Sequence, residues 1–197
     1  MFGSCDSDSS IRDYYRRQSW GDQSKFKNVL SRLSEEVEES GQLATLTELC
    51  ELLSFATDSS LSSLMTDSFS PILVKLARQD SNPDIMLLTT RAMTYLCDVN
   101  PRSLGFLVRH DAVPVLCQKL MVIEYLDVVE QCLQALEKIS REEPLACLQS
   151  GAVMAVLNYI DFFSTSMQTL LGKLLQGVTI AHGGVLLSNL VLKKRLL

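Results

Sequence analysis

Apolar residues recur at helical spacing through most of the chain. From Ser24 onward they stand at positions i, i+3, i+4 and i+7, as in the stripe formed by Phe26, Val29, Leu30 and Leu33. This spacing places them on one side of an α-helix. No segment shows the strict apolar–polar alternation that is typical of a half-buried strand. The pattern therefore predicts an all-α protein.

The helical pattern is itself repeated along the chain. The stripe at Phe26 recurs 43 residues later as Phe69, Ile72, Leu73 and Leu76. The same offset links further sets: Val29, Ile72 and Val115; Leu30, Leu73 and Leu116; Leu53, Leu96 and Ile139; Asp84 and Asp127; Ala92 and Ala135; Pro101 and Pro144. After Pro144 the offset shortens to 40, so that Val113 corresponds to Val153. So many coincidences at one offset indicate an internal repeat.

Each unit uses the same local signals. Pro101 and Pro144 each stand at the start of a short helix, where the missing N–H of proline costs nothing. A second helix over 112–122 and a longer third helix over 126–141 follow. Three helices in every ~40–47 residues are the dimensions of armadillo repeats, and one such unit cannot bury its own apolar face. We therefore expect an armadillo-like, right-handed α-solenoid of about three and a half three-helix repeats.

The pattern divides the chain into three parts. Residues 1–23 are rich in serine and aspartate and predict a flexible polar leader. The armadillo-repeat domain is expected over 24–168, followed by a poorly packed tail over 169–197 that matches no repeat. The expected units are 24–66, 67–110, 111–150 and an incomplete 151–168.

Composition narrows the function classes. Of 197 residues 47% are hydrophobic and 21% are charged, which excludes a chain that is disordered throughout or collagen-like. The net charge of −5 provides no general basic field for nucleic acid. No acidic residue follows Asp161, so the tail is basic while the rest of the chain is acidic. Six cysteines without a C-x-x-C pair are interpreted as buried small hydrophobes, and we expect no metal site and no cofactor.

Targeting signals are mostly negative. The first ten residues lack the apolar core of a signal peptide. The one membrane candidate, 174–192, is interrupted by glycines and polar residues and is unfavourable for insertion. We therefore expect no membrane contact, and a location in the cytoplasm, the nucleus or both.

Specific runs of sequence resemble a known family. The starts of two predicted second helices, Asp111–Leu116 and Gly151–Val156, and the third-helix run Cys132–Ser140 are similar to armadillo signatures. More specific matches are Leu46–Phe55, Asp84–Met86, Arg91–Leu96, Ile123–Val128 and Tyr159–Ser164, together with Asp13-Tyr14-Tyr15-Arg16-Arg17 in the leader. These runs resemble the N-terminal armadillo region of plant HECT-type ubiquitin-protein ligases, which are related to the animal thyroid-receptor-interacting HECT ligase. The resemblance covers roughly residues 12–168 and ends after Gln168.

The resemblance implies a role in protein ubiquitination. Such ligases carry ubiquitin on a cysteine of a C-terminal HECT domain, and their armadillo region is thought to bind substrates or regulators. Nothing in this chain resembles the HECT cysteine motif, so none of its cysteines is expected to be catalytic, and the chain alone is expected not to transfer ubiquitin. The tail, foreign to this pattern, suggests a truncated or alternatively processed product. The alternative to a ligase segment is a free-standing armadillo adaptor without a role in ubiquitin transfer.

Candidate binding residues lie on the predicted third helices, which line the concave groove of armadillo solenoids. In importin-type proteins Trp and Asn recur there four residues apart and grip an extended basic peptide. The corresponding pairs here are Glu48/Leu52, Arg91/Tyr95 and Gln134/Lys138, so that ladder is absent. Arg91, Tyr95, Gln134 and Lys138 instead predict a mixed polar strip for a protein partner, since Tyr and Arg are favoured interface anchors. An ordinary solvated helix face is the alternative interpretation.

Overall fold

The computed structural model describes residues 23–35, 38–57, 60–121 and 124–157, with a few isolated positions between 165 and 176. Within these ranges the regular elements are helices, and none is a strand. After a first helix over 23–34 come α2 (Glu39–Phe55), α3 (Ser63–Ala77), α4 (Pro83–Val99), α5 (Ser103–Arg109), α6 (Ala112–Leu120), α7 (Leu126–Glu142), α8 (Pro144–Gln149) and α9 (Ala152–Leu157). The predicted leader and tail, and the candidate membrane segment 174–192, lie almost entirely outside the described residues.

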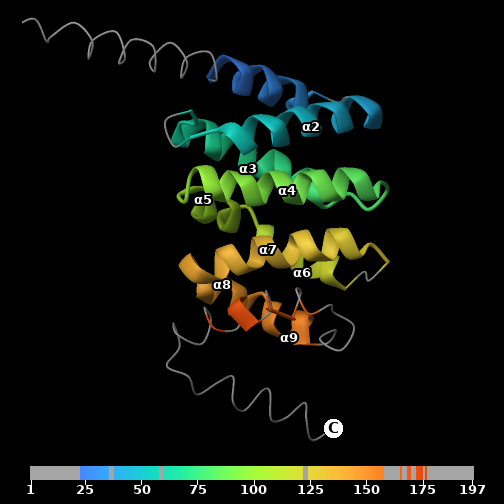
Figure 1. The fold of residues 1–197 in the computed structure, drawn as a ribbon, viewed down its shortest axis with the longest axis vertical. Coiled ribbons are helices and arrows are strands. Elements are labelled where there is room, and N and C mark those ends of the chain that lie inside the picture. Colours follow the sequence, from blue (N-terminus) through green and yellow to red (C-terminus); the bar gives the residue numbers. More distant parts are fainter. Residues whose placement is uncertain are drawn as a thin grey trace, which may run out of the picture.

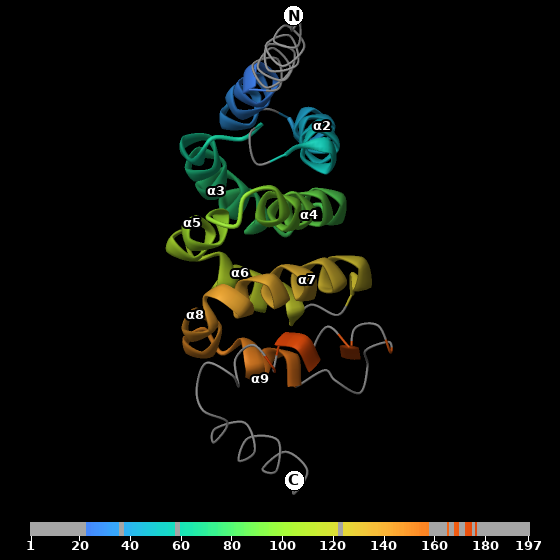
Figure 2. The same ribbon diagram turned by 60° about the vertical axis from the view of Figure 1, so that its left-hand side comes forward.

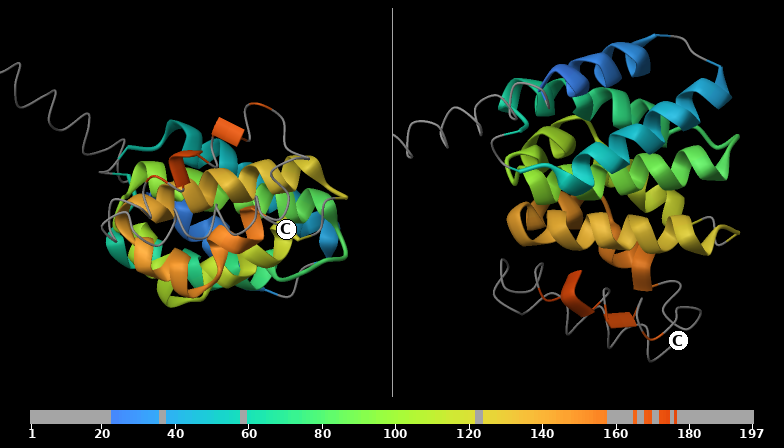
Figure 3. Two further views of the ribbon diagram at one scale, coloured as in Figure 1. Left: turned by 90° about the horizontal axis from the view of Figure 1, so that it is seen from below. Right: turned by 45° about the horizontal axis from the view of Figure 1, so that its top comes forward.

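The helices form a two-layered stack. The long helices α2, α4 and α7 lie side by side in one layer, and the shorter α3, α5, α6 and α8 form the other (Figures 1 and 2). Helix α4 packs on α2 on one side and on α7 on the other, while α6 packs on α7 and on α9 of the following unit. The view along the stack shows the successive units lying over one another (Figure 3). This is the all-α solenoid that the repeat predicts.

Proline stands at the start of two helices, but the predicted start at Pro101 is wrong by two residues, because α5 begins at Ser103 and Pro101 lies in the preceding turn. Asn82 caps α4 by accepting bonds from the backbone N–H groups of Asp84 and Ile85, at 3.0 and 3.3 Å, and Pro83 takes the first helical position. Pro144 likewise begins α8. The predicted third helix over 126–141 is confirmed as α7, and the predicted second helix over 112–122 corresponds to α6, which ends at Leu120; residue 122 lies outside the described residues.

One unit departs from the three-helix pattern. In the later units a residue with positive φ separates the short helix from the second one: Asp111 at 65° and Gly151 at 74°. The equivalent residue one repeat earlier is Ser68, which lies within the continuous helix α3. Serine has little tendency to adopt the left-handed conformation, whereas glycine and aspartate adopt it readily. The two helices therefore merge in this unit, and the helix continues through Pro71, the counterpart of Pro114.

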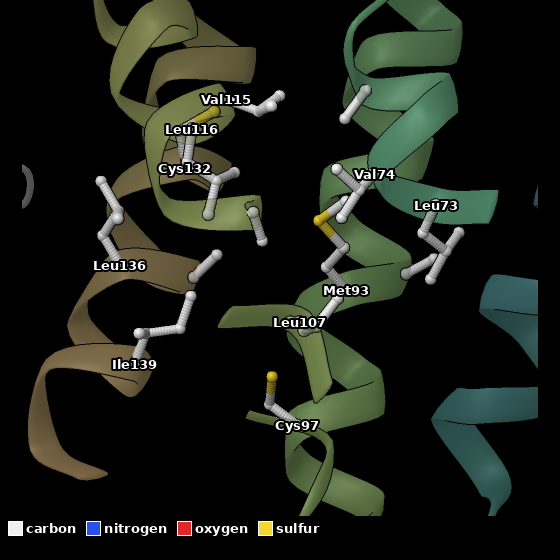
Figure 4. Close-up of a cluster of buried hydrophobic side chains, with 14 of the residues drawn as sticks. Leu73, Val74, Met93, Cys97, Leu107, Val115, Leu116, Cys132, Leu136 and Ile139 are labelled. Atoms are coloured by element: carbon white, nitrogen blue, oxygen red, sulfur yellow. The ribbon is translucent and has the colours of Figure 1, made fainter. Parts of the chain in front are cut away.

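Equivalent residues of neighbouring units meet in a continuous core. The ring of Phe26 packs edge-on against that of Phe69, its counterpart one repeat later, with centroids 6.3 Å apart. Figure 4 shows the next part of this core, where residues of α3, α4, α5, α6 and α7 converge around Met93. The apolar side chains on the inner side of α7 are all buried, namely Val129, Cys132, Leu133, Leu136 and Ile139. Leu30, Ile72 and Leu88 are only half-buried at the edge of the core. No single unit encloses this core by itself.

We predict that Leu73→Ala destabilises the protein by about 2–5 kcal/mol, because Leu73 is fully buried and its loss leaves a cavity. Leu64→Ala is the matched control: it makes the same change in the same helix at a side chain that is 82% exposed. This control should stay within roughly 0.5 kcal/mol of the wild type. Urea unfolding followed by circular dichroism measures both, and equal losses would contradict the continuous core.

Two glycines provide a second test. Neither Gly151 nor Gly105 has a neighbour that an added Cβ would meet, and only Gly151 has a positive φ. Gly151→Ala should therefore destabilise the protein by about 1–2 kcal/mol through backbone strain. Gly105→Ala, inside α5, should stabilise it by roughly 0.5–1 kcal/mol by favouring the helix. Thermal unfolding measures both, and the same sign for the two variants would contradict the left-handed linker.

Candidate protein-binding face

The three long helices present one continuous surface, here called the third-helix face: the outward side chains of α2, α4 and α7. Because α2, α4 and α7 lie side by side, the repeat places equivalent positions in rows across this face. One row contains Glu48, Arg91 and Gln134, and the next contains Leu52, Tyr95 and Lys138. All six side chains are half-buried. The predicted strip of Arg91, Tyr95, Gln134 and Lys138 therefore lies on two adjacent helices, and its role in binding stays a prediction.

Lys138 is not a free cation. Its ammonium group forms an ion pair with Oδ1 of Asp98, which ties α7 to α4. The Lys138 side chain is 29% exposed and that of Asp98 is 55% exposed, so solvent screens the pair and its contribution to stability is small. Sequence spacing identified the helix face of Lys138 but not this partner.

Glu48 is also held by a neighbouring group, and Arg91 acts electrostatically on a thiol of the adjacent helix. Arg91 lies close enough to Cys50 on α2 to oppose the burial-driven rise in that thiol's pKa. Arg32 of the first helix donates to Oε2 of Glu48 at 2.5 Å and to the Thr45 hydroxyl at 2.9 Å. The carboxylate of Glu48 on α2 is therefore partly fixed before any partner binds.

Two pockets open where α2 ends. The first, which we call the α2–α4 end pocket, has a volume of about 380 Å³ and is lined by Leu53, Ser54, Ala56, Tyr95, Asp98 and Val99. The second, of about 330 Å³, lies between the first helix and α2 and is lined by Lys25, Phe26, Glu48, Glu51, Leu52, Phe55 and Ala56. Ala56 lines both pockets. Of the four predicted strip residues, Tyr95 thus lines the α2–α4 end pocket.

The sequence interpretation missed Phe55. This ring, at the end of α2, is 87% exposed, the largest exposure among the large hydrophobic residues in the described part of the chain. A signal was present in the repeat, because the equivalent positions one and two units later hold Asp98 and Arg141. An aromatic residue where the other units carry charge is unlike a core position. Exposed apolar groups of this kind mark contact sites when other apolar residues lie beside them.

The cysteines of this region are buried and weakly acidic. Burial raises the pKa of Cys50 to about 11 and that of Cys97, Cys117, Cys132 and Cys147 to about 12. A thiol acts as a nucleophile only when it is ionised, so these five are inert at neutral pH. This agrees with their interpretation as small hydrophobic residues; Cys5 lies outside the described residues.

Neither metal ligands nor a membrane span is found in the described ranges. Within them no group of three or more His, Cys, Asp or Glu side chains could hold a metal ion. Among the same residues, no helix is long and apolar enough to cross a membrane.

Comparison with known proteins identifies the family. Residues 1–149 match the family described as "E3 ubiquitin-protein ligase TRIP12-like, TPR repeats". The chain belongs to this family. It is 62% identical over 173 residues to the E3 ubiquitin-protein ligase UPL4 of Arabidopsis thaliana, a match that covers 85% of the chain and 12% of that ligase. It is 55% identical to UPL3 of the same plant, over 73% of the chain and 8% of UPL3.

A vertebrate relative belongs to the same group. TRIP12 of Danio rerio is 38% identical over 79% of the chain and 8% of its own length. The chain thus corresponds to a segment of E3 ubiquitin ligases, and it spans about a tenth of the length of these relatives. In the tail, residues 171–186 match a family described as the C-terminus of a histone. Most of these positions lie outside the described residues.

Solved structures support the armadillo architecture. A designed armadillo repeat protein in complex with the peptide (KR)4 superimposes with a TM-score of 0.64 at 15% identity, covering 79% of this chain and 69% of its own. A second designed armadillo protein gives 0.66 at 15% identity, with 77% and 63% covered. The family description speaks of TPR repeats, which are two-helix units of about 34 residues. The 43-residue offset and the three helices α5, α6 and α7 match the armadillo unit instead.

We predict that the five buried thiols react slowly in the folded protein. At pH 8 an exposed thiol is roughly a tenth to a quarter ionised, whereas one with a pKa of about 12 is ionised in only about one molecule in ten thousand. In a Cys5→Ser variant, iodoacetamide should label these sites at least ~100-fold more slowly in buffer than in urea. The pKa values of these thiols lie above the 9.0 of an exposed thiol. As the pH is raised, the labelling rate of the folded protein should therefore keep rising at pH values where the rate of the unfolded protein has already levelled off. A rapidly labelled native site, identified by mass spectrometry, would contradict this.

Proposed function

We propose that this chain is the protein-binding segment of a HECT-type E3 ubiquitin ligase and that it recruits substrates or regulators through the third-helix face. The family supports the link to ubiquitination, because its members compared above are E3 ubiquitin-protein ligases. The fold supports the binding role. A stack of repeats offers an extended surface instead of an enclosed cavity, and such surfaces are commonly used for protein partners.

The observation that carries the proposal is the surface of α2 and α4. Tyr95 is half-buried and lines the α2–α4 end pocket, and the exposed Phe55 lines the second pocket, which shares Ala56 with the first. Charged residues line both pockets. Aromatic anchors in pockets, surrounded by polar groups, are the usual source of binding energy at protein interfaces. The designed armadillo protein that superimposes on this chain was solved with a peptide, which supports a peptide or a protein segment as ligand.

Binding of this kind is useful to a ligase because it raises the local concentration of a substrate near the catalytic cysteine. A tethered substrate meets that cysteine at an effective concentration set by the linker, which can exceed its free concentration many times over. The segment needs no chemistry of its own for this role.

We predict that replacing Arg91, Tyr95 and Lys138 together with alanine removes partner binding. The purified chain is immobilised and exposed to Arabidopsis extract, and bound proteins are quantified by mass spectrometry. The control replaces Lys75, Arg102 and Arg109, three exposed cations of the other helix layer. Proteins retained by the wild type and the control should fall by at least about tenfold on the face variant, a loss of roughly 1.4 kcal/mol. Equal retention by a face variant with unchanged circular dichroism would sink the proposal.

The proteins captured in this experiment also distinguish the two candidate functions, a ligase segment and a free-standing adaptor. In reactions containing Arabidopsis UPL4, the captured proteins should be ubiquitinated, and an excess of the isolated chain should inhibit this by competition. Captured proteins that UPL4 never modifies would favour the adaptor instead. The face variant serves as the control, because it should not compete.

A further inference from the structure

We propose that the α2–α4 end pocket and the second pocket, which share Ala56, together bind an extended peptide segment in which a basic residue stands beside an aliphatic or aromatic one; this rests on the proposed function and specifies its ligand. The α2–α4 end pocket is lined on its apolar side by Leu53, Ala56 and Val99 and on its polar side by Ser54 and Asp98, with Tyr95 contributing to both, whereas Phe55 and Glu51 line the second pocket. A volume of about 380 Å³ holds one or two side chains, not a folded domain.

The apolar part of the ligand is indicated by Phe55. Its ring is 87% exposed although Ala56, the next residue, lines both pockets. Leu52 of the same helix also lines the second pocket, so Phe55 stands among apolar neighbours instead of alone. An aliphatic or aromatic side chain packed against this ring would bury surface that otherwise stays in contact with water.

The basic residue of the ligand is indicated by the C-terminal ends of α2 and α4. Helices α2 and α4 end side by side, each with the partial negative charge of its C-terminal carbonyl groups, and neither has a basic residue in its last turn. Helix α7 differs, because its last turn contains Arg141, which pairs with Glu137. Neither α2 nor α4 thus supplies a cation for its own negative end, and at α4 the nearby cation is Lys138 of α7, which pairs with Asp98.

Two carboxylates strengthen this field. Asp98 lines the α2–α4 end pocket; Lys138 pairs with its Oδ1, and the Asp98 side chain remains 55% exposed. Glu51 is exposed one helical turn before Phe55 and lines the neighbouring pocket. Lys25 is the one cation among the residues lining the two pockets, and Glu48, which lines the same pocket, is paired with Arg32. Because Asp98 and Glu48 are already paired, the groups left to accept from an arginine or lysine are Glu51 and the carbonyl ends of α2 and α4, and the Phe55 ring offers a guanidinium group a further contact.

The test uses three fluorescein-labelled peptides of about ten residues, a length that spans neighbouring repeats in extended form. One alternates leucine and arginine, one serine and arginine, and one leucine and glutamate. Fluorescence anisotropy with the purified chain should show binding of the leucine–arginine peptide, with the other two at least about tenfold weaker. Stronger or equal binding of the leucine–glutamate peptide would overturn the assignment of charge, and equal binding of the serine–arginine peptide would overturn the apolar contact.

Surface variants locate the site without disturbing the core. Phe55→Ser should weaken binding of the leucine–arginine peptide by at least about fivefold, and Glu51→Lys by a similar factor that shrinks at high salt. The matched control is Leu64→Ser, since Leu64 is 82% exposed on the opposite layer, and it should bind like the wild type. Equal effects of Phe55→Ser and Leu64→Ser would overturn the site.

The result is distinguishable from failure of the proposed function. If Phe55→Ser still captures the proteins that the Arg91, Tyr95 and Lys138 variant loses, the face binds partners elsewhere and this inference alone is wrong. Sedimentation of the wild type and of Phe55→Ser tests one further possibility, that the chain forms a dimer. A wild-type dimer that Phe55→Ser converts to a monomer would mean that a second copy of the chain occupies the pocket, which also overturns the peptide assignment.

Discussion

Every other feature of this protein depends on the inability of one repeat to bury its own apolar surface. A unit of three short helices has too little interior, so the buried side chains of one unit must be covered by the next. The contact of Phe26 with Phe69 shows this directly, because the two rings are equivalent positions of successive units. Stacking forces the long helices α2, α4 and α7 into one layer, and that layer is the surface on which the candidate sites lie.

Polar contacts between units add specificity to this apolar stacking. Lys119 is 4% exposed and reaches back from α6 to the carbonyl oxygen of Gln79 at 3.0 Å and to the carboxylate of Asp80. In the same way, Lys138 of α7 pairs with Asp98 of α4 in the preceding unit. Apolar faces alone tolerate sliding, whereas a buried ammonium group loses its partners if the units shift. The buried Lys119 contact therefore fixes how α6 is placed on the preceding unit, and the solvent-screened Lys138 pair adds less.

Much of the fold could be predicted because its signals are local or periodic. Asn82 and Pro83 begin α4 through their own backbone chemistry, and the 43-residue offset identifies the core without any structure. The merging of α3 was harder to predict, since it depends on the reluctance of Ser68 to adopt a positive φ in one particular linker. The candidate site was predicted only as a helix face. Spacing cannot show that Lys138 turns toward Asp98, nor that the ring of Phe55 remains uncovered, because both depend on side chains of neighbouring units.

The inward and outward positions of the long helices follow different rules. Leu53, Leu96 and Ile139 are equivalent, apolar and almost fully buried, because stacking demands the same shape in each unit. The outward positions are not repeated: Phe55 becomes Asp98 and then Arg141. Asp98 and Arg141 are held in ion pairs, whereas Phe55 is 87% exposed and stacking does not account for it. A partner that contacts α2 and α4 would therefore meet a surface unlike that of α7.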